Sequence, residues 1–121
     1  MYELTINNQV YTFNFGMGFL RTINQEAVKT SDIKGVSEPV GFRLYLAQLI
    51  DGSPEALVHM LDIANRGQNP RITQAQLDAF IDDPDTDIER LTQEVLDFLK
   101  RNNATRKQTA AIQEAVAKLQ K

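Results

Sequence analysis

Four acidic residues in the second half of the chain have the spacing of a calcium-binding loop. The acids fall at the first, third, fifth and twelfth positions of an EF-hand loop, as Asp83, Asp85, Asp87 and Glu94. Such a loop needs glycine at its sixth position, where this chain has Ile88. Ile88 also begins an apolar stripe of helical period, which a calcium loop would interrupt. We therefore favour a solvated acidic turn in which Asp87 caps the following helix.

Two other short features resemble chemical sites. His59 is the only histidine, so a His-cluster metal site is excluded. It lies off the apolar stripe of its predicted helix with no predicted acid beside it. We expect a boundary residue there, with a pH-sensitive contact as the alternative. The glycines at Gly16 and Gly18 follow a predicted strand and open a helix, but the lysine and hydroxyl of a phosphate loop are absent, so we expect a tight turn.

The segment 105–121 is basic and has one narrow apolar strip. It carries four basic residues and a single acid, and the strip consists of Ile112, Val116 and Leu119. Three interpretations remain open. The segment is a terminal helix packed on its own domain, a docking helix for a partner or neighbouring subunit, or a weak nucleic-acid contact.

The chain lacks the residue combinations of common enzymes. We find no nucleophile beside a base, no carboxylate pair at an obvious cleft and no cofactor fingerprint, so we predict a protein that is not an enzyme, with no catalytic residue, cofactor or metal. Cysteine is absent, which excludes disulfides and thiolate chemistry. The net charge of −3 argues against a dedicated nucleic-acid binder. Without a signal peptide or a long apolar run, we expect a cytosolic protein that does not cross a membrane.

The period of the apolar residues predicts the fold class. We expect an α+β protein that is mainly α-helical, with an N-terminal two-stranded β-hairpin packed on about six helices, and 121 residues suffice for one core. The first helix is expected to end near Val28, followed by a loop over residues 29–40. The later helices are expected to start after Ser53, Thr73 and Asp87, which are good N-caps. Asn102 and Asn103 are expected to end the helix that starts after Asp87, before the last helix begins.

The first fifteen residues alternate as two strands. We place Asn8 and Gln9 at the tip of a two-residue turn. This register pairs Ile6 with Tyr11, Leu4 with Phe13 and Tyr2 with Phe15. It gathers the large apolar residues on one face, and we expect a shift of the turn by one residue to split that face. The helices must then cover the aromatic side.

Over residues 1 to about 101, the chain resembles the tail assembly chaperones of long-tailed phages and prophages of Gram-positive bacteria (siphophages). The resemblance is carried, in order, by YELTINNQVYTFNFGMGFLRTIN, GSPEAL, PRIT, FIDD, DIE and VLDFLK. The departure is Asn8, at a hairpin tip where glycine is common.

The resemblance implies a mainly helical fold with a small hairpin and no catalytic residues. It implies self-association, and binding to the tape measure protein and the tail tube protein during tail assembly in the host bacterial cytoplasm. The chaperone would be absent from the finished virion. Relatives also occur in a longer, frameshifted form, so this chain would be the short form.

The resemblance divides the chain at the predicted break. Residues 1–102 would be the hairpin and helical chaperone domain, and residues 103–121 a variable C-terminal helix for docking or oligomerisation. The candidate contact strip is Ile112, Val116 and Leu119. The alternatives are a small helical adaptor or regulatory protein-binding domain of phage or host, and a helical nucleic-acid-binding domain.

Overall fold

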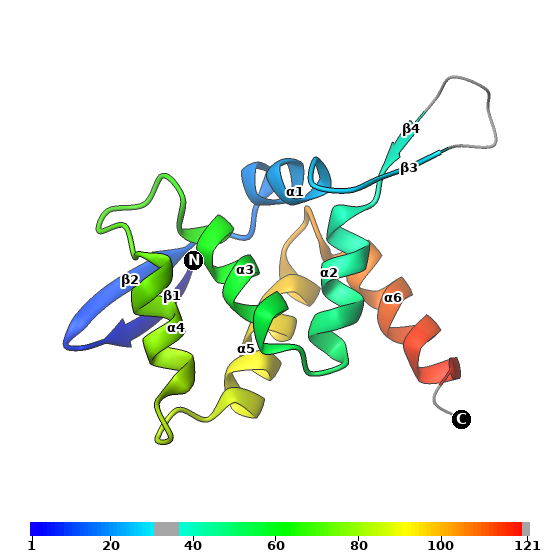
Figure 1. Ribbon diagram of the computed structural model, residues 1–121. Helices are drawn as coiled ribbons and strands as arrows, with labels where there is room; N and C mark the ends of the chain where they lie inside the picture. Colours follow the sequence, from blue (N-terminus) through cyan, green and yellow to red (C-terminus); the bar gives the residue numbers. More distant parts are fainter. Residues whose placement is uncertain (31–36, 120–121) are drawn as a thin grey trace.

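The computed structural model describes residues 1–30 and 37–119, which form two short β-ribbons and six helices around one core (Figure 1). The elements are β1 (Tyr2–Ile6), β2 (Gln9–Phe13), α1 (Met17–Asn24), β3 (Val28–Thr30), β4 (Ser37–Pro39), α2 (Gly41–Ile50), α3 (Pro54–Asn65), α4 (Gln74–Asp82), α5 (Ile88–Arg101) and α6 (Arg106–Leu119). The predicted class, mainly α-helical with an N-terminal hairpin, is confirmed.

The first hairpin forms, but the predicted register is wrong. β1 pairs with β2 so that Tyr2 faces Phe13 and Leu4 faces Tyr11, which leaves Asn7 and Asn8 at the tip. Both tip residues have positive φ, 53° and 65°, as a type I′ turn requires, and asparagine tolerates that region well. A tip at Asn8 and Gln9 would have required glutamine at positive φ. Moving a two-residue turn by one position shifts each residue's partner by two positions. Because side chains alternate with a period of two, the same side chains stay on the same face. The alternation alone therefore could not select the register.

The aromatic side of this hairpin is covered by helices, as predicted. Tyr2, Phe13 and Phe15 are buried. The Tyr2 ring lies 5.0 Å from the Phe98 ring of α5, measured between centroids. Edge contacts then run from Phe15 to Phe19 of α1, at 5.1 Å between centroids. The hairpin therefore contributes to the main core, which joins strands and helices that are distant in sequence.

α1 ends earlier than predicted, and a second ribbon follows it. α1 stops at Asn24 instead of near Val28, and Val28–Thr30 pairs with Ser37–Pro39 as antiparallel strands. The predicted loop over residues 29–40 is therefore wrong at both ends, and its part at residues 31–36 lies outside the described residues. The two strands extend away from the helices (Figure 1).

α1 and α2 meet at their ends through Gly41. A Cβ at Gly41 would lie 1.9 Å from the Ile23 carbonyl oxygen, so only glycine permits this approach. The Asn24 side chain accepts a hydrogen bond from the backbone N–H of Phe42 at 3.0 Å. Asn24 therefore satisfies one of the N–H groups that the start of α2 leaves without an intrahelical partner.

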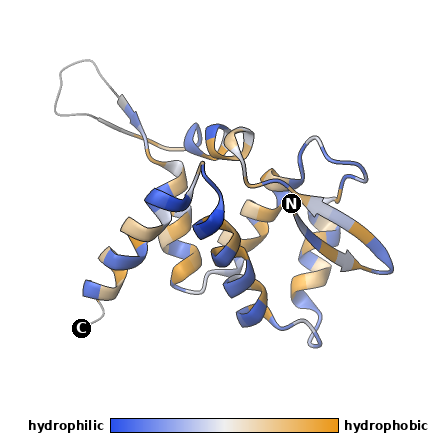
Figure 2. Ribbon diagram, turned by 180° about the vertical axis from the view of Figure 1, so that it is seen from behind, coloured by the Kyte–Doolittle hydropathy of each residue, from blue (hydrophilic) through white to orange (hydrophobic). Residues whose placement is uncertain are grey.

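The predicted caps of the next three helices are confirmed. Ser53 accepts from the Ala56 N–H at the start of α3, and Asp87 accepts from the Arg90 N–H at the start of α5. Thr73 and Gln76 form the predicted capping box of α4. Figure 2 shows the loop between α3 and α4 as hydrophilic, which agrees with its surface position.

A buried asparagine ties that loop to the first hairpin. The Asn65 amide nitrogen donates to the Thr12 carbonyl oxygen at 2.9 Å. Its side-chain oxygen accepts from the Ile72 N–H at 2.7 Å and from the Arg71 guanidinium at 2.9 Å. Asn65 is fully buried and satisfies backbone groups that would otherwise lack partners.

α6 packs along α2 and α5. Thr105 and Thr109 are buried, and the Thr105 hydroxyl donates to the Leu99 carbonyl oxygen at 2.7 Å. The first turns of α6 are therefore held against the end of α5.

Candidate protein-binding surface

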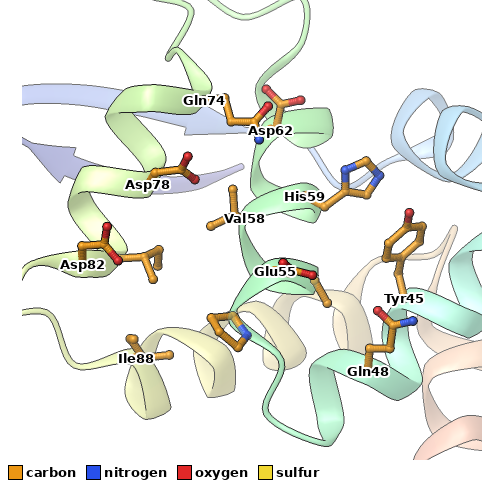
Figure 3. A pocket seen from close by; sticks show the side chains of 13 residues that line it. Tyr45, Gln48, Glu55, Val58, His59, Asp62, Gln74, Asp78, Asp82 and Ile88 are labelled. Atoms are coloured by element: carbon orange, nitrogen blue, oxygen red, sulfur yellow. The ribbon is translucent and has the colours of Figure 1, made fainter.

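A cleft lies between α3 and α4 (Figure 3). It has a volume of about 680 Å³ and is bounded on its other sides by α2 and the start of α5. Apolar side chains contributed by three helices line it, namely Val58 of α3, Ile81 of α4 and Ile88 of α5. All three are only partly buried, so the cleft exposes an apolar surface to solvent.

Acidic side chains surround this apolar surface. α4 contributes Asp78 and Asp82, one helical turn apart, and α3 contributes Glu55 (Figure 3). Asp62 also lines the cleft, but it forms ion pairs with Arg71 at 2.8 Å and Arg66 at 3.3 Å. The lining residues include no lysine or arginine, so the cleft has a negative potential.

The expectation that His59 has no acid beside it is wrong. The His59 Nε2 atom contacts the Glu26 carboxylate, and the His59 ring lies against the Tyr45 ring with centroids 4.5 Å apart. Burial, together with the negative charge of Glu26, raises the pKa of the Tyr45 hydroxyl. Tyr45 and His59 form one end of the cleft. His59 is partly exposed, as expected of a boundary residue.

The acidic turn before α5 is organised by its own hydrogen bonds. Asp87 caps α5, while Asp83 accepts from the Asp85 N–H at 2.9 Å. The Thr86 hydroxyl donates to the Phe80 carbonyl oxygen at 2.7 Å, which closes the turn onto α4. These bonds match the capped turn preferred from the sequence. Among residues 1–30 and 37–119, no three or more histidine, cysteine, aspartate or glutamate side chains are placed so that they could hold a metal ion.

The segment around Gly16 and Gly18 is the predicted strand-to-helix turn. Gly16 is the N-cap residue of α1, and its N–H donates to the Asn14 side-chain oxygen at 3.0 Å.

Within the part of the chain that the structure describes, no helix is long and apolar enough to span a bilayer.

The predicted strip of α6 is divided between the core and the surface. Ile112 packs against the core and Val116 is half-buried, whereas Leu119 is 85% exposed. The three side chains therefore do not form one continuous free surface. The exposed part is the last turn of α6, near Leu119.

The cleft was not predicted from the sequence. Gln74, Asp78 and Asp82 recur every four residues and lie on one side of α4, so a polar row was recognisable. The sequence does not show that this row faces Glu55 across the apolar side chains of the cleft, which come from three helices. That arrangement depends on how α3 and α4 pack.

The arrangement suits binding more than catalysis. Exposed apolar side chains inside a charged border are typical of surfaces that receive a partner segment. The border is negative, so a complementary segment would bring apolar residues together with lysine or arginine.

Comparison with known proteins agrees with a binding role. No curated protein and no solved structure gives a significant match to the chain. One family model, described as "Phage tail assembly chaperone protein, TAC", matches residues 3–114. The match runs from the first hairpin into α6 and includes every residue that lines the cleft. The chain therefore belongs to the phage tail assembly chaperone family.

Proposed function

We propose that this protein is a chaperone that associates with itself and with the tape measure protein while a phage tail is built. The tail tube protein is its second partner. The protein acts in the cytoplasm of the host bacterium and is absent from the finished virion. The observation that carries the proposal is the family match over residues 3–114.

The surface features support a protein-binding mode of action. The cleft exposes Val58, Ile81 and Ile88 inside an acidic border, which suits an amphipathic helix with basic flanks. A chaperone family also points to a non-enzymatic role, in agreement with the sequence analysis.

The last helix supports separate roles for the two parts of the chain. We assign residues 1–102 to the chaperone domain and residues 103–121 to a helix that also makes contacts between molecules. The buried Thr109 and partly buried Ile112 anchor this helix, while Leu119 is available to another molecule. Ile112 thus has an anchoring role, and Val116 with Leu119 supplies the contact.

Co-expression with a fragment of the tape measure protein tests the function. The soluble fraction of a fragment that is insoluble alone is measured with and without this chain. An unrelated acidic helical protein of similar size serves as the control. We expect the chaperone, but not the control, to keep the fragment soluble and to co-purify with it. A fragment that stays insoluble and does not co-purify contradicts the proposal.

A further inference from the structure

We propose that the α3–α4 cleft of one copy receives the exposed end of α6 from a second copy. This inference rests on the self-association proposed above and names the two surfaces that make it. The acceptor is the cleft with its acidic border, and the donor is the last turns of α6, with Val116, Lys118 and Leu119.

The acceptor is open to another molecule. None of its lining residues belongs to α6, and α6 lies on the far side of α2 from α3 and α4 (Figure 1). A copy therefore cannot fill the cleft with its own helix in this fold. The volume of about 680 Å³ lies within the range of ligand pockets, roughly 300–1,000 Å³, and suits side chains from one face of a helix.

The donor is the least covered part of the helical body. Leu119 is 85% exposed and has the largest exposed fraction among large apolar side chains in the described residues. One turn earlier, Val116 is half-buried, so only part of the apolar strip is used within the chain. Lys118 beside it is 73% exposed, and within the described residues its ion pair is with Glu114 of its own helix, at 3.3 Å.

The two surfaces are complementary in apolarity and in charge. Val116 and Leu119 would lie against the apolar side chains of the cleft. Lys118 would face the acids of the border, of which Asp78 and Asp82 are exposed. None of Glu55, Asp78 and Asp82 forms an ion pair within the described part of the chain. A cation from another molecule can therefore approach them.

A contact between two different surfaces leaves one acceptor and one donor free at the ends of every open oligomer. Such head-to-tail contacts add further copies, into a ring if the rotation closes or a helical array if it does not. The inference therefore predicts growth beyond a dimer as the protein concentration rises.

Two charge-changed variants and their mixture test the contact in analytical ultracentrifugation. The acceptor variant is Asp78→Lys with Asp82→Lys, and the donor variant is Lys118→Glu with Leu119→Glu. All four side chains are exposed, so both variants are expected to fold. Matched controls change exposed residues elsewhere, Glu3→Lys with Glu38→Lys for the acceptor and Lys107→Glu with Ala110→Glu for the donor.

We expect each variant alone to associate at least about tenfold more weakly than the wild type, because like charges then face each other. The controls associate as the wild type does. In a 1:1 mixture, the intact cleft of the donor variant binds the intact α6 of the acceptor variant, so the mixture regains the association that each variant alone has lost.

Four results would overturn the inference. If either variant associates as strongly as the wild type, the surface that it changes is not part of the contact. A mixture that stays monomeric excludes the pairing of these two surfaces. Variants that still self-associate but no longer solubilise a tape measure fragment would assign the cleft to that partner and leave the proposed function intact. A wild-type protein that is monomeric at all concentrations contradicts the proposed self-association itself.

Discussion

At the scale of single residues, Gly41 sets how closely α1 and α2 approach. A Cβ there would lie 1.9 Å from the Ile23 carbonyl oxygen, so Gly41→Ala forces the two backbones apart. We expect this substitution to lower the free energy of unfolding by at least about 2 kcal/mol, measured by chemical denaturation. Gly18→Ala is the matched control, because a Cβ at that helical position meets nothing within 4 Å. It should leave stability unchanged or raise it by up to about 1 kcal/mol, and equal losses for both variants would contradict the account.

Asn65 is a second residue that contributes strongly to the free energy of unfolding, through its buried hydrogen bonds. Asn65→Ala removes the acceptor of the buried Ile72 N–H and the donor to the Thr12 carbonyl. We expect a loss of about 2–3 kcal/mol in the free energy of unfolding, because buried backbone groups are left unpaired. Asn103→Ala, at an exposed position between α5 and α6, should change it little. A loss below roughly 0.5 kcal/mol for Asn65→Ala would show that water replaces the amide.

Tyr2 makes the free energy of unfolding depend on pH in the alkaline range. Burial raises the pKa of its hydroxyl, and so does the hydrogen bond that it donates to Glu94 at 2.9 Å. Because the folded state holds this proton more tightly, the contribution is complete below the unfolded pKa of roughly 10 and declines as the pH rises above it. The decline is at most about 1.4 kcal/mol per pH unit for one proton. We expect unfolding free energies to fall more steeply above pH 10 for the wild type than for Tyr2→Phe, and parallel profiles would contradict this.

At the scale of elements, α6 combines an anchored part with a free end. A chain that ends at Ala115 keeps the buried Thr105 and Thr109 and the packed Ile112. We expect it to unfold at nearly the wild-type temperature while losing self-association. A chain that ends at Asn103 uncovers parts of α2 and α5, so its free energy of unfolding should fall by about 3 kcal/mol or more. If the shorter deletion destabilises as much as the longer one, the end of α6 is part of the core.

The elements that sequence could predict are those whose signals are local. Ser53, Thr73 and Asp87 each cap a helix through a bond to a residue three positions later, so a short window suffices. The alternation could not select the hairpin register, because a pairing shifted by two residues satisfies it equally. The positive φ angles of Asn7 and Asn8 at the tip select the register instead. β3 and β4 have three residues each and carry no alternating pattern. The cleft was missed because the distance between Glu55 and Asp78 across it depends on the packing of α3 against α4.

At the scale of the whole molecule, this chaperone presents a closed core and two separate surfaces. The hairpin aromatics are buried and therefore are not available to a partner in this fold. The acidic cleft and the end of α6 remain available, at different sides of the helical body (Figure 1). A molecule with one acceptor and one donor can form an array along an extended client.

From the proposed self-association and tape measure binding, we expect several copies of this chaperone to bind along one tape measure chain, and the mass of the complex gives their number. Complexes with tape measure fragments of increasing length are purified, and their masses are measured by light scattering after size-exclusion chromatography. We expect the number of bound chaperone copies to rise with fragment length. A complex with one copy whatever the fragment length, or no complex at all, would contradict it.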